Sequence, residues 1–171
     1  MDDNAERLAR RYGKDDPPSA LFKRERPGGR LLILSEHAHA GLPIMLTEFG
    51  GIAYSDNVNA TWGYTRSDNA EELANRYCEL VIAVRSVAML AGFCYTQFAD
   101  TYQEANGLLY ADRTPKFPLK QMALATRGPR NRDEKTQESA WRERIMNYNR
   151  VQQTQVAPDS SLTDPSARVE R

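Results

Sequence analysis

The hydrophobic positions of the chain gather in its middle third, and the first clear run there predicts a β-strand. This run covers residues 42–46, and two residues later comes a carboxylate, Glu48, followed by Gly50 and Gly51. A short apolar run bounded by turn residues is typical of a fully buried strand in a parallel sheet. Pro43 suits the first position of such a strand, where its missing N–H costs least. The pattern therefore predicts a buried strand with Glu48 at its end.

The next pattern predicts a long helix that leads into a second strand. Asp68, followed three residues later by Glu71, resembles a capping box. From there to about Leu90, apolar residues recur at helical spacing and form one stripe, made of Leu73, Tyr77, Leu80, Val81, Val84 and Ala88. Gly92 ends this pattern, and residues 93–96 have the composition of a strand. Strand, helix and strand of these lengths form a βαβ unit, in which the two strands are parallel.

Polar segments flank this centre. Residues 1–30 form a charged lead-in, within which 4–12 and 18–26 could each form a short helix. Residues 127–171 are poor in apolar residues and rich in Arg, Gln, Asn, Ser and Pro, so we expect most of this tail to be disordered. The alternative for the tail is one transient amphipathic helix that uses Ala140, Trp141, Ile145 and Tyr148. Shorter predicted elements are a strand at 31–34 and a helix from Pro118 to Thr126.

Composition narrows the classes of function. The 171 residues are 40% hydrophobic and 27% charged, and the formal net charge is +0, so nothing favours nucleic acid or an anionic membrane as a partner. Cys78 and Cys94 are expected to be small buried hydrophobes rather than a disulfide or a metal site. His37 and His39 are too few ligands for a metal site, so we predict no metal and no cofactor. The N-terminus lacks the apolar segment of a signal peptide, which favours a cytoplasmic location.

Polar side chains follow the second predicted strand. Asp100, Glu104 and Asn106 lie in the segment after Tyr95. Because the carboxyl ends of parallel strands meet at one edge of a sheet, where ligands bind in α/β folds, these residues should neighbour Glu48. The alternative is that Glu48 is only the first solvated residue after its strand.

A long loop is predicted between about Gly50 and Asp68, and it contains Tyr54, Trp62 and Tyr64 among Ser, Asp, Asn and Thr. Loops of this length in compact domains are usually functional or disordered. Aromatic rings between amides and carboxylates suit a carbohydrate surface, which makes Trp62 a candidate for substrate binding. The alternative is that Trp62 and Tyr64 anchor the loop to the core.

Two stretches resemble the C-terminal barrel segment of glycoside hydrolase family 2, the beta-galactosidase and beta-glucuronidase group. The first is Pro43–Gly51, PIMLTEFGG, which is similar to the nucleophile motif on barrel strand seven. The second begins with GFCYTQ at 92–97 and continues through Asp100, EANGL at 104–108 and DRTPK at 112–116. It resembles strand eight and the loop after it. Order and spacing both fit over about residues 30–126.

The resemblance implies an α/β fold, in which residues 31–126 are the last part of a TIM (β/α)₈ barrel, about strands seven and eight with their helices. It implies a retaining glycosidase with two carboxylates, of which Glu48 is the nucleophile. Tyr95 takes the place of an aromatic platform for the sugar ring. Asp100, Glu104 and Asn106 are candidates for orienting sugar hydroxyls or neighbouring side chains. The turn of Asp112, Arg113 and Lys116 is expected to be structural.

The chain also departs from the family. The acid/base glutamate of the family follows an asparagine on strand four, and no Asn-Glu dipeptide occurs in this chain. The Asn-x-Lys sequence of the glucuronidases is replaced by Asn106-Gly107-Leu108. A whole barrel takes about 250 residues. We therefore expect a C-terminal fragment that is inactive alone, with a glycoside as substrate and the missing N-terminal barrel portion as partner. The alternative is a non-catalytic remnant that binds sugar or another protein.

Overall fold

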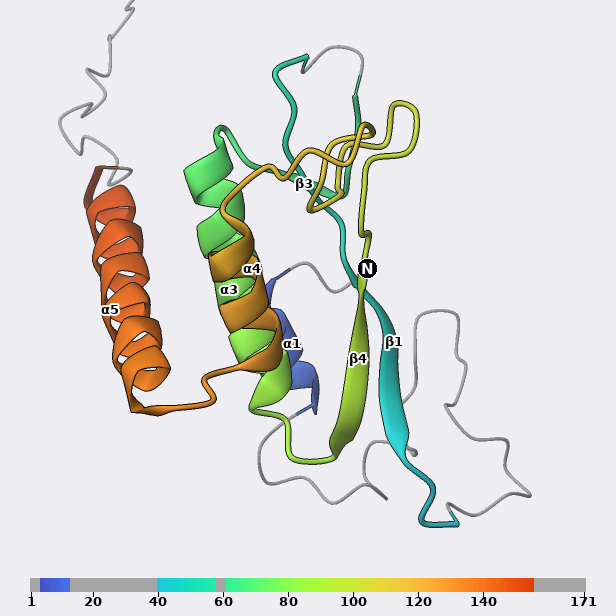
Figure 1. The fold of residues 1–171 in the computed structure, drawn as a ribbon, viewed down its shortest axis with the longest axis vertical. Helices are drawn as coiled ribbons and strands as arrows, with labels where there is room; N and C mark the ends of the chain where they lie inside the picture. Colours follow the sequence, from blue (N-terminus) through green and yellow to red (C-terminus); the bar gives the residue numbers. More distant parts are fainter. Residues whose placement is uncertain (1–3, 13–39, 58–60, 156–171) are drawn as a thin grey trace, which may run out of the picture.

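The computed structural model describes residues 4–12, 40–57 and 61–155, and it shows a mixed α/β chain with short parallel strands (Figure 1). The elements in chain order are α1 (Ala5–Tyr12), β1 (Ile44–Gly50), β2 (Ile52–Ala53), β3 (Thr65–Arg66), α3 (Ala70–Arg85), β4 (Leu90–Thr96), α4 (Leu119–Arg127) and α5 (Arg132–Gln155). The helices predicted from 4 and from Pro118 are confirmed as α1 and α4. The predicted helix at 18–26, the strand at 31–34, His37 and His39 lie outside the described residues.

Strands β1 and β4 pair in parallel, as the predicted βαβ unit requires. The pairing runs from Ile44 opposite Leu90 to Gly50 opposite Thr96. The long loop expected between β1 and α3 contains a second small sheet, because β2 and β3 also pair in parallel. The described residues between β1 and α3 therefore include two short strands where the sequence predicts only a loop.

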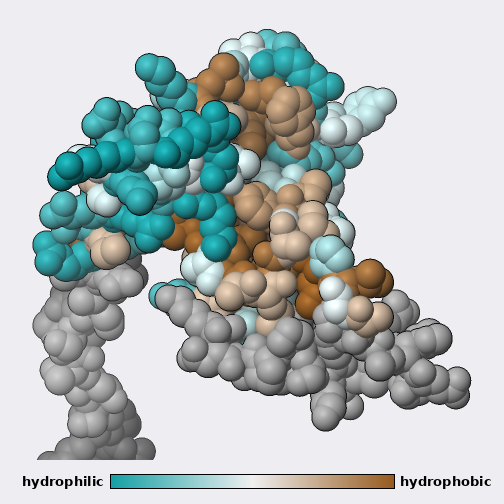
Figure 2. Space-filling view, turned by 60° about the horizontal axis from the view of Figure 1, so that its bottom comes forward, coloured by the Kyte–Doolittle hydropathy of each residue, from teal (hydrophilic) through white to brown (hydrophobic). Residues whose placement is uncertain are grey.

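The prediction that β1 is fully buried is wrong. Leu46 and Phe49 are buried in the core, whereas Met45 is 50% exposed and Glu48 is exposed. Figure 1 shows α3, α4 and α5 on one side of the β1–β4 pair, so within the described residues the helices cover one face of this sheet. Figure 2 shows the consequence at the surface: hydrophilic residues gather over the side of α5, and more hydrophobic ones lie over the side of the two strands.

Helix α3 supplies more core residues than any other described element. The residues of its predicted stripe from Leu73 to Val84 are buried. The cap lies one residue later than predicted, because the Asn69 side chain accepts a hydrogen bond from the Glu72 N–H at 2.8 Å. The Glu72 carboxylate in turn accepts one from the Asp68 N–H at 2.7 Å. The helix ends at Arg85 rather than near residue 90, where β4 begins.

Helix α5 corrects the prediction of a mostly disordered tail. Residues 132–155 are helical, and Trp141 and Ile145 are 5% and 2% exposed. These two residues are four positions apart, so they lie on one face of the helix. The Trp141 indole N–H donates to the Asn75 side chain on α3 at 3.4 Å. Two apolar residues are enough to hold α5 against the core because both side chains are almost completely buried.

The two cysteines differ in their environment. Cys78 is buried in α3, as predicted, and Cys94 is exposed on β4, which corrects the prediction that it is buried. Both are free thiols. Among the described helices, none combines the length and the apolar character that crossing a membrane requires.

Candidate functional site at the carboxyl ends of β1 and β4

Glu48 lies in an irregularity of β1 rather than after its end. Leu46 pairs with Phe93 and Phe49 pairs with Tyr95, so β1 has one more residue than β4 over this interval. Such a β-bulge re-aims side chains and is common beside active sites. Phe49 is fully buried, and Glu48 is exposed. Within the described part of the chain, no hydrogen bond or ion pair engages the Glu48 carboxylate.

The two glycines after Glu48 join the ends of both strands. Gly50 and Gly51 have φ values of 107° and 81°, which glycine adopts without strain. A Cβ on Gly50 would come within 2.4 Å of the Tyr95 ring. The Gly51 N–H donates to the Thr96 carbonyl at 2.9 Å. The strand that carries Glu48 and the strand that leads into the polar segment after Tyr95 therefore end side by side, as predicted.

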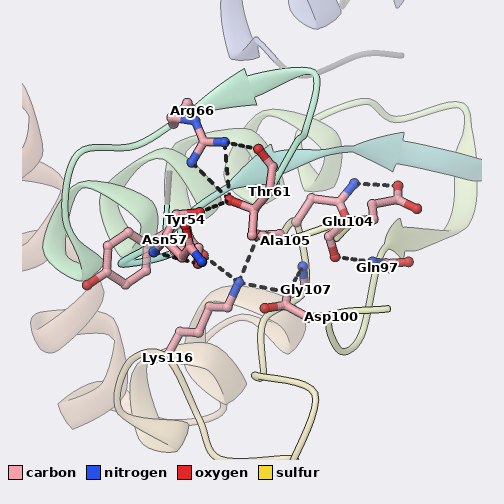
Figure 3. A network of polar contacts seen from close by, with 12 residues as sticks. Tyr54, Asn57, Thr61, Arg66, Gln97, Asp100, Glu104, Ala105, Gly107 and Lys116 are labelled. Atoms are coloured by element: carbon pink, nitrogen blue, oxygen red, sulfur yellow. Dashed lines mark hydrogen bonds and ion pairs between the residues drawn. The ribbon is translucent and has the colours of Figure 1, made fainter. Parts of the chain in front are cut away.

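A buried ammonium organises the loops beyond these strands (Figure 3). Lys116 Nζ donates to the Asp100 carboxylate and to the Tyr54 and Ala105 carbonyls, each at 2.8 Å. The same Asp100 oxygen accepts the Gly107 N–H at 2.8 Å. Burial lowers the pKa of Lys116 from its ordinary value, and the Asp100 carboxylate opposes this shift. Asp100 therefore binds a neighbouring side chain, and Lys116 has a structural role, as expected for its turn.

Glu104 and Asn106 contact one another. The Asn106 Nδ2 donates to Glu104 Oε1 at 3.0 Å, and the Gln97 side chain donates to the Glu104 carbonyl at 3.3 Å. The Asn106 side chain is fully buried, and its Oδ1 has no hydrogen-bond partner in the described part of the chain. Asn106 therefore holds the Glu104 carboxylate in position. The sequence does not predict that Gln97 contributes by binding the Glu104 carbonyl.

Tyr95 packs in the core, where the resemblance implied a platform for a sugar ring. Its ring meets the rings of Phe49 and Tyr77 edge to face, with centroid distances of 5.6 and 4.9 Å. Burial of the hydroxyl raises the pKa of Tyr95, and this hydroxyl has no hydrogen-bond partner among the described residues. The Tyr95 ring contacts Tyr77 on α3, which a family motif alone does not reveal.

Trp62 and Tyr64 are exposed by 45% and 54%. Their ring centroids lie 5.9 Å apart with an interplanar angle of 74°. Of the two interpretations of this loop, anchoring by the rings is therefore not supported, because the backbone anchors it instead. The Trp62 N–H donates to the Gln103 carbonyl at 2.8 Å, and the Ala105 N–H donates to the Trp62 carbonyl at 3.0 Å.

A separate polar cavity of about 440 Å³ lies between α1, α3 and α5. Arg7, Glu72, Arg76 and Glu79 are among its lining residues, and none of the predicted site residues lines it. Within the described residues, no group of three or more His, Cys, Asp or Glu side chains is arranged to hold a metal ion.

A scan of the chain against models of known protein families finds no match, and a search of curated proteins finds none either.

Proposed function

We propose that this chain is the nucleophile-bearing C-terminal part of a retaining glycoside hydrolase of the family 2 type, with β1 and β4 as strands seven and eight of a TIM (β/α)₈ barrel. The observation that carries the proposal is the position of Glu48. Its carboxylate is exposed and unpaired within the described residues, at a bulge just before two parallel strands end together. Ligand sites of α/β folds lie at this edge.

In the proposed reaction, the Glu48 carboxylate attacks the anomeric carbon while the bond to the leaving oxygen breaks, which gives a covalent glycosyl-enzyme. A second carboxyl group, about 5–5.5 Å away in retaining enzymes, protonates the leaving oxygen and later removes a proton from the water that releases the sugar. The chain has no Asn-Glu dipeptide for that role. The earlier barrel strands therefore supply the acid/base, and the isolated chain does not turn over.

The surrounding residues have different parts in this proposal. Glu104, in the loop after β4, can accept a hydrogen bond from a sugar hydroxyl. The Asn106 side chain donates to its carboxylate at 3.0 Å and so holds it in position. Asp100 and Lys116 support the loops through their buried ion pair. Tyr95 fixes the position of Gly50 and takes no part in binding.

The test combines this chain with the earlier barrel strands of a family 2 enzyme, supplied as a second chain, and assays the product on chromogenic glycosides. Glu48→Gln should lower kcat by more than about a thousandfold, because the covalent step is lost. Azide should partly restore turnover of Glu48→Ala, since a small nucleophile fits the space left by the side chain. Glu71→Gln, an exposed carboxylate on α3, is the control and should leave turnover unchanged. Near-normal turnover of Glu48→Gln would refute the proposal.

A second candidate is a non-catalytic sugar-binding module. The exposed rings of Trp62 and Tyr64 favour it, since they can bind a sugar without any carboxylate chemistry. Sugar binding together with the absence of Glu48-dependent turnover in the combined enzyme would support this candidate over the first.

A further inference from the structure

The exposed aromatic pair is held by a fixed backbone. The Tyr64 N–H donates to the Gly51 carbonyl at 3.0 Å, which adds to the two bonds that Trp62 makes with the segment after β4. Trp62 also forms a parallel β-bridge with Glu104. Tyr64 is therefore bonded to the residue after β1, and Trp62 is bonded to the segment after β4. A binding surface that is ordered before the ligand arrives loses less entropy on binding.

Gly63 decides which way the two rings point. A Cβ on Gly63 would lie 2.4 Å from the Cβ of Ala53, so this residue must be glycine and must face β2. Side chains alternate along an extended segment. With Gly63 turned inward, Trp62 and Tyr64 share the opposite, outward side, which agrees with their exposure. The pair is therefore a built feature of the fold rather than two isolated surface residues.

The groups around the rings favour a sugar as the occupant. Arg66 holds Thr61, the residue before Trp62, by donating to its carbonyl at 2.5 Å and to its hydroxyl at 3.4 Å. Figure 3 shows Thr61, Arg66 and Glu104 in the same group of loops. Aromatic rings and arginine also occur at protein–protein interfaces, an occupant that the test below separates from a sugar. Apolar rings next to hydrogen-bonding groups match a pyranose, whose C–H faces are apolar and whose edge carries hydroxyls.

The position of Trp62 and Tyr64 relative to Glu48 indicates how many sugar rings a ligand of both sites would have. Gly51, which accepts the bond from Tyr64, is only three residues beyond Glu48 and ends the same strand region. We propose that Trp62 and Tyr64 form a second sugar subsite beside the nucleophile, so that the substrate is an oligosaccharide with at least two rings rather than a simple monosaccharide glycoside. This inference rests on the proposed function for its reaction, but the binding it predicts does not need turnover.

The chain contains two tryptophans, and this makes the test specific. Trp62 is exposed and Trp141 is buried, so the ¹H–¹⁵N NMR spectrum of the full chain should contain two indole N–H signals with separate environments. Titration with β-linked glucose, mannose and galactose oligomers of one to four units should shift the Trp62 signal and leave that of Trp141 in place. Affinity should rise at least about tenfold from one unit to two or more. The absence of any shift across this panel would overturn the inference.

Variants separate the aromatic pair from other causes of a shift. Trp62→Ala, followed through backbone amides, and Tyr64→Ala should each weaken binding by about tenfold or more. Tyr102→Ala is the matched control, because this ring is 93% exposed and has no ring contact among the described residues, and it should bind like the parent chain. A Trp62 signal that moves with protein concentration and not with sugar would assign the pair to a contact between two copies and would refute the subsite.

Glu48→Gln distinguishes the two proposals. In this variant, the oligosaccharides should still shift the Trp62 signal, because the ring pair and not the carboxylate forms the second subsite. If binding persists and the combined enzyme never shows Glu48-dependent turnover, the proposed function fails and the subsite stands. If turnover depends on Glu48 but Trp62→Ala leaves both oligosaccharide affinity and KM unchanged, the subsite fails and the proposed function stands.

Discussion

At the scale of single residues, the loops at the strand ends depend on one buried charge. The Lys116 side chain is fully buried and that of Asp100 is 9% exposed. The ammonium uses all three of its donors, one on Asp100 and two on carbonyls that lie 11 and 62 residues away in sequence. Such a pair is costly to desolvate but far more costly to break, because one charge is then left buried and unpaired.

Replacing Lys116 by methionine should therefore destabilise the chain by about 3–5 kcal/mol, the range for removing one partner of a buried pair. Urea unfolding of the two proteins measures the difference. Lys120→Met, at an exposed lysine of α4, is the control and should change the free energy of unfolding by less than about 0.5 kcal/mol. An equal, small effect of both substitutions would show that the ion pair does not hold the loops.

The sequence predicted some of these residues better than others. Glu48 was placed next to the end of its strand because an apolar run and two glycines are local signals. The burial of Lys116 could not be predicted, because it depends on carbonyls brought together by the fold. The same holds for Tyr95: its motif fits the family, but the direction of its ring is set by α3. The sequence therefore predicts that the two strand ends meet, but it misjudges which side chains face outward.

At the scale of elements, α4 and α5 are joined by an ion pair that fixes their turn. The Glu134 carboxylate accepts hydrogen bonds from two nitrogens of Arg127, at 2.8 and 2.6 Å, and from the Arg130 N–H at 2.7 Å. These donors lower the pKa of Glu134 to about 2, with the Arg127 side chain as the largest cause. The low apolar content of this stretch predicts disorder, because composition does not reveal which charges pair.

The pH dependence of this joint follows from that pKa. An unfolded glutamate titrates near 4.5, so the folded form binds fewer protons, and the pair stabilises the joint fully above that pH. The stabilisation should be lost as the pH falls through about 2. An NMR titration of the Glu134 side chain should show a midpoint near 2, and Arg127→Gln should move it back toward 4.5. A midpoint near 4.5 in the parent chain would contradict the observed joint.

Docking of α5 has its own test at Trp141. Truncation of this buried ring to alanine should cost about 3–5 kcal/mol, the range for deleting a core aromatic. The amides of α5 should then exchange with solvent much faster, as measured by hydrogen exchange and mass spectrometry. Met146→Ala, at a side chain that is 67% exposed on the same helix, should leave exchange unchanged. Fast exchange of α5 in the parent chain would restore the interpretation of a disordered tail.

At the scale of the whole molecule, the described helices cover only one face of the sheet formed by β1 and β4. The helices lie on one side of β1 and β4, while Met45, Glu48 and Cys94 are exposed on these strands (Figure 1). Parallel sheets are normally buried on both faces. The nucleophile proposed here therefore stands on a surface that further barrel strands would enclose, and those strands are also the proposed source of the acid/base.

The measurement that tests this account most directly is the chemical identification of the residue that bonds to the sugar. The combined enzyme is treated with a 2-deoxy-2-fluoroglycoside that carries a good leaving group, which slows release of the glycosyl-enzyme, and its peptides are analysed by mass spectrometry. We predict one sugar adduct, on Glu48, and none in the Glu48→Gln variant. An adduct on a different carboxylate, or unchanged labelling of Glu48→Gln, would contradict the account.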